Sequence, residues 1–286
     1  MKPRRSDAID WPAGRAAWGQ PMFDAIRGAL AEMPDRWPTL EHLTALACRR
    51  GIVNARGRPL RFVTPDDSSA HYELRIAYDG EVMARCNWHD FFNACQWLTI
   101  PRTKARISEL HAQVLEAGGD AERRRRSALR DRMTLFDEGG MVVVSPHDSL
   151  LDAVRSFRWH ELFVERRTET MAGMRFLLLG HAMLENALAP FIGVTAKALL
   201  LQAALPSADH EAEWLADIDV QTARWIDRQA ILPETDRQRL APLPFLGVPG
   251  WDVRNEDPRF YDNAAYFRPG FARSVHCRGA SQPGMG

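Results

Sequence analysis

Residues 87–104 carry a helical pattern of apolar and polar positions that includes side chains typical of functional sites. The apolar positions form one stripe, made of Trp88, Phe91, Phe92, Cys95 and Leu98. His89, Asn93 and Gln96 form a polar stripe beside it. We therefore predict a helix over residues 88–99, capped by Asn87, whose polar edge could line a pocket.

The same kind of periodicity predicts most of the remaining elements. Helices are expected over residues 21–33, 39–49, 101–117, 121–136, 148–157, 159–166 and 211–229. Strands are expected over 59–63 and 141–144. Residues 174–179 fit either a strand or the start of the helix through residue 188, and we favour a strand followed by Gly180 and the helix. Residues 71–85 read as a β-hairpin, because Asp79-Gly80 suits a tight turn. The expected fold is α+β and helix-dominated, with many short helices around a small sheet that includes this hairpin.

The C-terminal part of the chain is rich in proline and glycine. Three prolines and two glycines make residues 242–251 an extended strap, which we expect to pair little with a sheet and to bury its apolar side chains. The 286 residues, 45% of them hydrophobic, suffice for a sizeable core. We predict an N-terminal leader over 1–19, a single globular domain over 20–270 and a flexible tail over 271–286.

Charge and cysteine content narrow the classes of partner. The 37 basic and 37 acidic residues cancel, so nucleic acid is not favoured as a partner. The four cysteines show no paired spacing typical of zinc sites or disulfides. No secretory h-region follows the basic start, and the longest apolar region, 174–205, is interrupted by polar residues, so we expect no membrane association. A soluble cytoplasmic protein of undetermined oligomeric state is predicted.

His181 and Glu185 are four residues apart and would share one face of a helix. Together with His89 they could bind a divalent metal, the one cofactor that the sequence suggests. The alternative is a helix-surface pair or a hydrogen-bonded buried histidine. Without metal, His89 could act as a general base oriented by Asp90 or Glu185, although Asp90 also suits a capping role. Asp137 or Glu138 could orient or activate water.

Arg102 and Lys104 follow Pro101 in the first turn of a predicted helix, where free N–H groups favour an anion. A phosphate or carboxylate could bind there, with Asn93 nearby. The structural alternative is an ion pair with Asp137 or Glu138.

Two other kinds of site find less support. Residues 122–132 are rich in arginine, but acidic neighbours and the absence of interleaved aromatics favour a solvated face over a nucleic-acid surface. Neither glycine-rich phosphate loop occurs, and no Gly-x-Ser-x-Gly elbow is present.

Six motifs occur in order along the chain: NWHDFFN (87–93), PRTK (101–104), LFDEGG (135–140), GHAMLE (180–185), PLPFLGVPGW (242–251) and FYDNAAYFRP (260–269). In this order and spacing they resemble an uncharacterised bacterial family, domain of unknown function 3025, over nearly all of residues 20–270. The resemblance implies one full-length domain and a bacterial cytoplasmic setting. It implies no activity, ligand or catalytic residue.

The leading hypothesis is a soluble metal-assisted or acid/base hydrolase that acts on a small anionic or phosphate-bearing substrate. Its expected catalytic residues are His89, Asp137 and Glu138, its substrate-binding residues Asn93, Arg102 and Lys104, and its metal ligands His89, His181 and Glu185. The alternative is a non-catalytic protein- or RNA-interaction domain, in which the polar motifs form a structural network.

Overall fold

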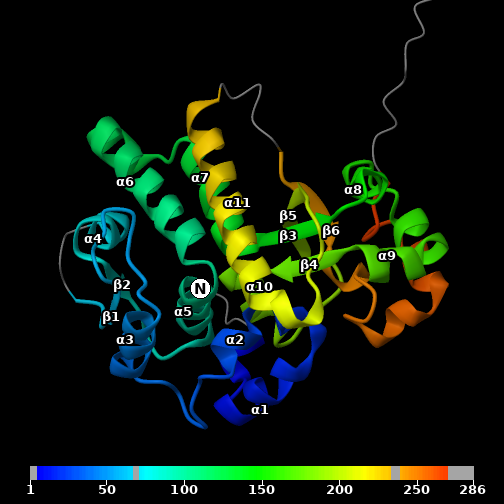
Figure 1. Ribbon diagram of the computed structural model, residues 1–286, viewed down its shortest axis with the longest axis horizontal. Coiled ribbons are helices and arrows are strands. Elements are labelled where there is room, and N and C mark those ends of the chain that lie inside the picture. The colour runs from blue at the N-terminus through cyan, green and yellow to red at the C-terminus, as the bar shows by residue number, and fades with distance from the viewer. Residues whose placement is uncertain (1–4, 67–70, 233–238, 270–286) are drawn as a thin grey trace, which may run out of the picture.

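A four-stranded sheet crosses the middle of the molecule in the computed structural model, which describes residues 5–66, 71–232 and 239–269 (Figure 1). Its strands are β3 (Gly140–Ser145), β4 (Arg175–Leu178), β5 (Thr195–Gln202) and β6 (Ala241–Pro244), in the order β4-β3-β5-β6. β3 pairs parallel with β5 and antiparallel with β4, and β6 pairs antiparallel with β5. β3 is buried throughout, as its run of apolar residues predicts.

Helices surround this sheet and dominate the fold, which confirms the expected helix-rich α+β class. The α-helices are α1 (Trp11–Ala16), α2 (Arg27–Leu30), α3 (Leu40–Arg49), α4 (Tyr72–Asp79), α5 (Trp88–Thr99), α6 (Pro101–Arg124), α7 (Ala128–Gly139), α8 (Asp148–Arg155), α9 (Arg167–Gly173), α10 (His181–Ala187) and α11 (Glu211–Ile231). Short helical turns add η1 (Arg5–Ala8), η2 (Ala17–Gly19), η3 (Pro21–Ile26), the π-helical η4 (Glu161–Glu165), η5 (Ala208–His210), η7 (Phe245–Gly247), η8 (Val253–Glu256) and η9 (Pro258–Asp262).

The sheet divides the interior into two cores, because successive side chains of a strand point to opposite faces. Val142 and Val144 face the core that α6, α7 and α11 cover, where Phe136 packs on Trp225 with 5.2 Å between ring centroids. Figure 1 shows these three helices side by side. Val143 faces the other core, which includes the apolar stripe of α5 and helix α8.

The expected β-hairpin over residues 71–85 is wrong. Residues 72–79 form helix α4, and the following strand β2 (Glu81–Met83) pairs parallel with β1 (Arg61–Val63). Gly80 has φ 71° and donates its N–H to the carbonyl of Ile76, so the Asp79-Gly80 pair ends a helix instead of turning a hairpin. A tight hairpin turn and a helix C-terminus both use a glycine in the left-handed region, so the Asp79-Gly80 pair alone could not distinguish them.

Most of the other helical predictions are confirmed, although residues 21–26 form a 3-10 helix, residues 161–165 form a π-helix and the helix expected over 121–136 is interrupted. Asn87 caps α5, with its Oδ1 accepting from the N–H of Asp90 at 2.8 Å. The expected helix over 121–136 is not continuous, because α6 bends at Gly119 (φ 50°, ψ −132°) and α7 begins only after the cap Ser127. Because α7 extends to Gly139, Asp137 and Glu138 belong to its last turn.

The strap (residues 242–251) is more regular than expected. Its first residues belong to β6, where Pro242 and Pro244 pair with Lys197 and Thr195 at the edge of the sheet. Edge strands tolerate proline because one side of the strand needs no N–H donor. The strap's apolar residues Leu243, Phe245, Leu246, Val248 and Trp251 are all buried, as predicted.

The segment expected to be a leader is helical and packed from Arg5 onward. Trp11 stacks on Trp88 with ring centroids 5.2 Å apart, and Trp18 stacks on Phe91 at 5.8 Å. The expected tail lies outside the described residues. Within the described part of the chain, no helix has both the length and the apolar character needed to span a membrane.

Candidate functional site

A polar hollow of about 420 Å³ lies where α4, α5, α6, α7 and α10 meet. Five residues that the sequence analysis selected line it: His89, Asn93, Asp137, Glu138 and His181. They come from three separate helices, and their convergence is a tertiary feature that the sequence analysis could only hypothesise. We call this cavity the polar hollow.

Close approach of two backbone segments brings α10 to the end of α7. A Cβ on Gly180 would lie 2.4 Å from the backbone N of Gly140 and 2.5 Å from the carbonyl O of Glu138, so no side chain fits at this position. Gly180 also ends the predicted β-strand and begins the predicted helix. His181, the next residue, is thereby placed beside the polar stripe of α5.

His89 and Glu185 form an imidazole–carboxylate pair. Nδ1 of His89 lies 3.1 Å from Oε2 of Glu185, and the other carboxylate oxygen accepts a hydrogen bond from Ser6 at 2.6 Å. Glu185 is nearly buried, whereas a quarter of the His89 side chain is exposed. A carboxylate in this position holds the orientation of the imidazole ring, which is the arrangement of an oriented general base.

His181 packs against the His89 ring. Its ring centroid lies 4.5 Å from that of His89, and its Nδ1 lies 3.2 Å from Oε1 of Gln96. Burial lowers the pKa of His181 to about 3, although Asp137 nearby acts in the opposite direction. His181 is therefore a neutral imidazole at neutral pH, suited to hydrogen bonding and not to carrying charge.

Lys104 is buried beneath the polar hollow and neutralised by Asp137. Its Nζ lies 2.6 Å from Oδ1 of Asp137 and 2.9 Å from Oδ1 of Asn93. Burial alone would raise the pKa of Asp137, but Lys104 and His181 outweigh it and leave that pKa below its ordinary value. The structural alternative that the sequence analysis gave for Lys104, an ion pair with Asp137, is the arrangement found.

Glu73 of α4 is a titratable group in the polar hollow that the sequence analysis missed. Its Oε2 atom is buried and makes no hydrogen bond to any described residue. Burial, with a contribution from the Asp137 charge, raises the pKa of Glu73 to about 7. A carboxyl group of this kind can give or take a proton near neutral pH.

His111 of α6 was also missed. It lines the polar hollow and accepts a hydrogen bond from Nε of Arg130 at 3.3 Å. Burial lowers the pKa of His111 to about 4. His111 lies beside the apolar face of α6, four residues after Ile107, but only tertiary packing identifies it as part of the site.

Arg102 does not reach the polar hollow, so the site expected to contain both Arg102 and Lys104 is divided. The carboxylate of Asp219, on α11, accepts the backbone N–H groups of Arg102 at 2.9 Å and Thr103 at 2.8 Å. The N–H groups at the start of α6, which we expected to bind an anionic ligand, are therefore capped by the protein itself.

Two other arginines line the polar hollow. Arg85 precedes α5 and Arg126 lies between α6 and α7, and both are exposed. Guanidinium groups at an opening of this kind can bind carboxylate or phosphate. The side chains of Arg123 and Arg124, which belong to the arginine-rich segment, lie outside the described residues.

The expected metal ligands are close together but bonded to protein partners. His89 and Glu185 bond to each other, and His181 bonds to Gln96. Over residues 5–66, 71–232 and 239–269, no group of three or more His, Cys, Asp or Glu side chains has an arrangement that could hold a metal ion.

Glu73 is expected to make the protein less stable as the pH rises from about 4.5 to about 7. Below this range both states hold the proton, and within it the unfolded chain releases the proton before the folded one. The free energy of unfolding should fall by roughly 3 kcal/mol from this group alone. Urea unfolding of Glu73→Gln and the unmodified protein at several pH values measures the difference.

The comparison with Glu73→Gln is needed because His111 and His181 act in the opposite sense. Their low folded-state pKa values stabilise the fold above about pH 6.5, and this contribution is lost as the pH falls. Parallel stability curves for the two proteins would contradict the prediction. Carbon-13 NMR titration of the Glu73 carboxyl group checks the same pKa without a variant.

A family model described as "Protein of unknown function (DUF3025)" matches residues 60–271 of this chain. The match confirms the resemblance that the six motifs suggested, from residue 60 onward. No curated protein and no solved structure matches the chain significantly.

Proposed function

We propose that this chain, which belongs to the DUF3025 family of proteins of unknown function, is an acid–base hydrolase of small anionic substrates. One observation carries the proposal. An oriented imidazole, His89, and a carboxyl group with a pKa near neutrality, Glu73, line the same solvent-reachable hollow. Acid–base catalysis needs such a pair, one group to accept a proton and one to donate it.

In the proposed reaction, His89 takes a proton from water as the water oxygen attacks the carbonyl carbon or the phosphorus of the substrate. Glu185 keeps Nδ1 of His89 occupied at 3.1 Å, so Nε2 is the atom that accepts the proton. Protonated Glu73 donates its proton to the leaving oxygen as the scissile bond breaks. Transfer of the proton from His89 through solvent to Glu73 restores the starting state.

The anionic part of the substrate is assigned to Arg85 and Arg126. Both line the polar hollow, whereas Lys104 is already paired with Asp137 and Asn93. In this proposal Lys104 of α6 joins α7 through Asp137 and α5 through Asn93, and it does not touch the substrate. A cytoplasmic setting, expected from the sequence, is part of the same proposal.

The metal-assisted form of the hypothesis is the less favoured one. Among the described residues, His89, His181 and Glu185 are not arranged as a group of three that could hold a metal ion, and Nδ1 of His89 is hydrogen-bonded to Glu185 itself. The acid–base form uses this bond as it is. Hydrolysis that survives treatment with a chelator supports the acid–base form, and hydrolysis that is lost and then restored by a divalent metal contradicts it.

A panel of chromogenic carboxylate esters and phosphate esters tests the proposed function. Saturable turnover of at least one anionic member is the expected result. The free carboxylate or phosphate released from that member should inhibit competitively, because substrate and product occupy the same hollow. The absence of turnover across the panel would contradict the hydrolase proposal.

Replacing Arg126 with glutamine should raise KM for the anionic substrate about tenfold, because a charge-assisted hydrogen bond to the substrate is lost. kcat should change little, since this contact forms before the chemical step and persists through it. Steady-state kinetics measures both. Arg125→Gln is the matched control: this neighbouring arginine is also exposed but does not line the polar hollow. Equal effects of the two substitutions would argue against the assignment.

A further inference from the structure

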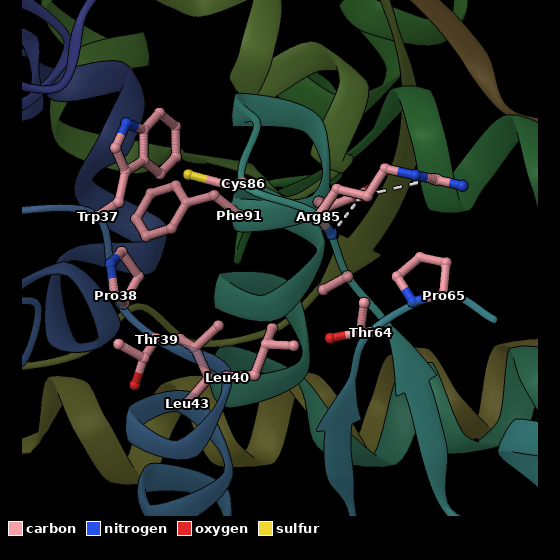
Figure 2. Close-up of a pocket in the computed structure, with 12 residues that line it drawn as sticks. Trp37, Pro38, Thr39, Leu40, Leu43, Thr64, Pro65, Arg85, Cys86 and Phe91 are labelled. Carbon is pink, nitrogen blue, oxygen red and sulfur yellow. Dashed lines mark hydrogen bonds and ion pairs between the residues drawn. The ribbon is translucent and has the colours of Figure 1, made fainter.

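A second hollow, of about 400 Å³, lies beside the polar one and differs from it in chemistry. Its walls are largely apolar and include Trp37, Pro38, Leu40, Leu43 and Phe91 (Figure 2). We call it the apolar hollow. Nothing in the proposed acid–base reaction uses it.

The two hollows adjoin and share part of their lining. Pro65, Arg85 and Asp90 line both of them. Oδ2 of Asp90 accepts the backbone N–H of Arg85 at 2.8 Å and lies 3.9 Å from its guanidinium. Figure 2 shows Arg85 across the hollow from Trp37. A molecule that occupies both hollows would therefore pass a cation at the junction.

The aromatic wall of the apolar hollow is held firmly from behind. The Trp37 ring packs 4.6 Å from the rings of both Trp11 and Trp88. Trp37 is only half-buried and lines the hollow. Phe91 packs behind it in the same cluster. An apolar group that displaces water from such a preformed wall gains affinity without first ordering the site.

We infer that the apolar hollow binds an acyl or aryl group of the same molecule whose anionic end lies in the polar hollow. The ligand class is an amphipathic anion, a carboxylate or phosphate joined to an apolar group. The inference depends on the proposed function only for the choice of the polar hollow as the anion site. Arg85 lines both hollows, so it can bind the anionic end of a ligand whose apolar group lies in the apolar hollow; this favours one amphipathic ligand over two separate ones.

Straight-chain carboxylates from butanoate to octanoate test the inference by binding alone. Each added CH₂ should lower Kd about fourfold while the chain extends within the apolar hollow. Isothermal titration calorimetry measures Kd. Thr64→Trp, an exposed position on the wall of the apolar hollow, should abolish this dependence on chain length. Thr168→Trp, exposed on α9, is the matched control and should preserve it.

Cys86 supplies an independent probe, because this exposed thiol lines the apolar hollow whereas the exposed thiol of Cys48 does not. Octanoate should slow alkylation of Cys86 by N-ethylmaleimide several-fold and leave Cys48 unaffected, as read by peptide mass spectrometry. Equal rates with and without octanoate would overturn the inference.

A neutral probe tests the link between the two hollows. Octanoate should bind at least tenfold more tightly than 1-octanol, and Arg85→Gln should reduce the difference. Equal affinities in the unmodified protein would mean that the apolar hollow acts alone, which overturns the inference of a single amphipathic ligand. None of these measurements requires turnover, so failure of the hydrolase proposal would be distinguished from failure of this one.

Discussion

Replacement of His89 by glutamine is expected to lower kcat/KM for an anionic ester by about 10²–10⁴-fold, the range for loss of a general base. The glutamine amide can still donate to Glu185, so the contact between α5 and α10 survives while the proton acceptor is removed. The loss should appear mainly in kcat, because the substrate is held by other groups. Steady-state kinetics with the most active substrate of the panel measures the effect.

The chain offers a matched control for this substitution. His160 also places its Nδ1 3.1 Å from a glutamate, Oε1 of Glu165, but both side chains are exposed and neither lines the polar hollow. His160→Gln should leave kcat/KM unchanged. If His89→Gln retained more than about a tenth of the activity, the general-base role would be excluded.

Glu185 is a positioning residue in this scheme. Glu185→Gln should lower kcat less than His89→Gln does and leave KM nearly unchanged, because the ring loses the carboxylate that orients it while the proton acceptor remains. A residue with a structural role alone would change the free energy of unfolding without this selective loss in kcat.

Signals carried by neighbouring residues explain which parts of the fold could be predicted. The cap of Asn87, the apolar stripe of α5 and the buried run of β3 each depend on residues close together in the sequence. Gly180 likewise identifies the transition from strand to helix that places His181. The approach of His89 to His181 could be hypothesised because each lies on a helix with one clear apolar face.

The errors have equally physical causes. Tyr72, Leu74 and Ile76 alternate with polar residues as in a strand, yet Tyr72 and Ile76 also share a face of helix α4. Because α4 was read as a strand, Glu73 was not considered for the site. The capping of α6 by Asp219 joins residues 117 positions apart, and no local pattern records such a contact. Arg102 was misplaced for that reason.

Replacement of Lys104 by methionine is expected to destabilise the fold by about 3–5 kcal/mol, the range for breaking a buried ion pair. The Lys104 side chain is almost fully buried, and its loss leaves the Asp137 carboxylate without its cation and Oδ1 of Asn93 without its donor. Methionine preserves most of the volume of the side chain, so the missing charge is the main change. Urea unfolding at pH 7 measures the loss.

Two further variants separate the charge from the packing. Lys197→Met replaces a lysine of β5 that has no ion pair among the described residues. This substitution should lower the free energy of unfolding by less than about 1 kcal/mol. Lys104→Met/Asp137→Leu should recover much of the lost stability, because the unpaired carboxylate is also removed. The deficit of Lys104→Met should also shrink as the pH falls, since the lone Asp137 carboxyl then becomes protonated in the folded state. A deficit independent of pH and unchanged in the double variant would mean that Lys104 stabilises the protein through its methylene groups instead.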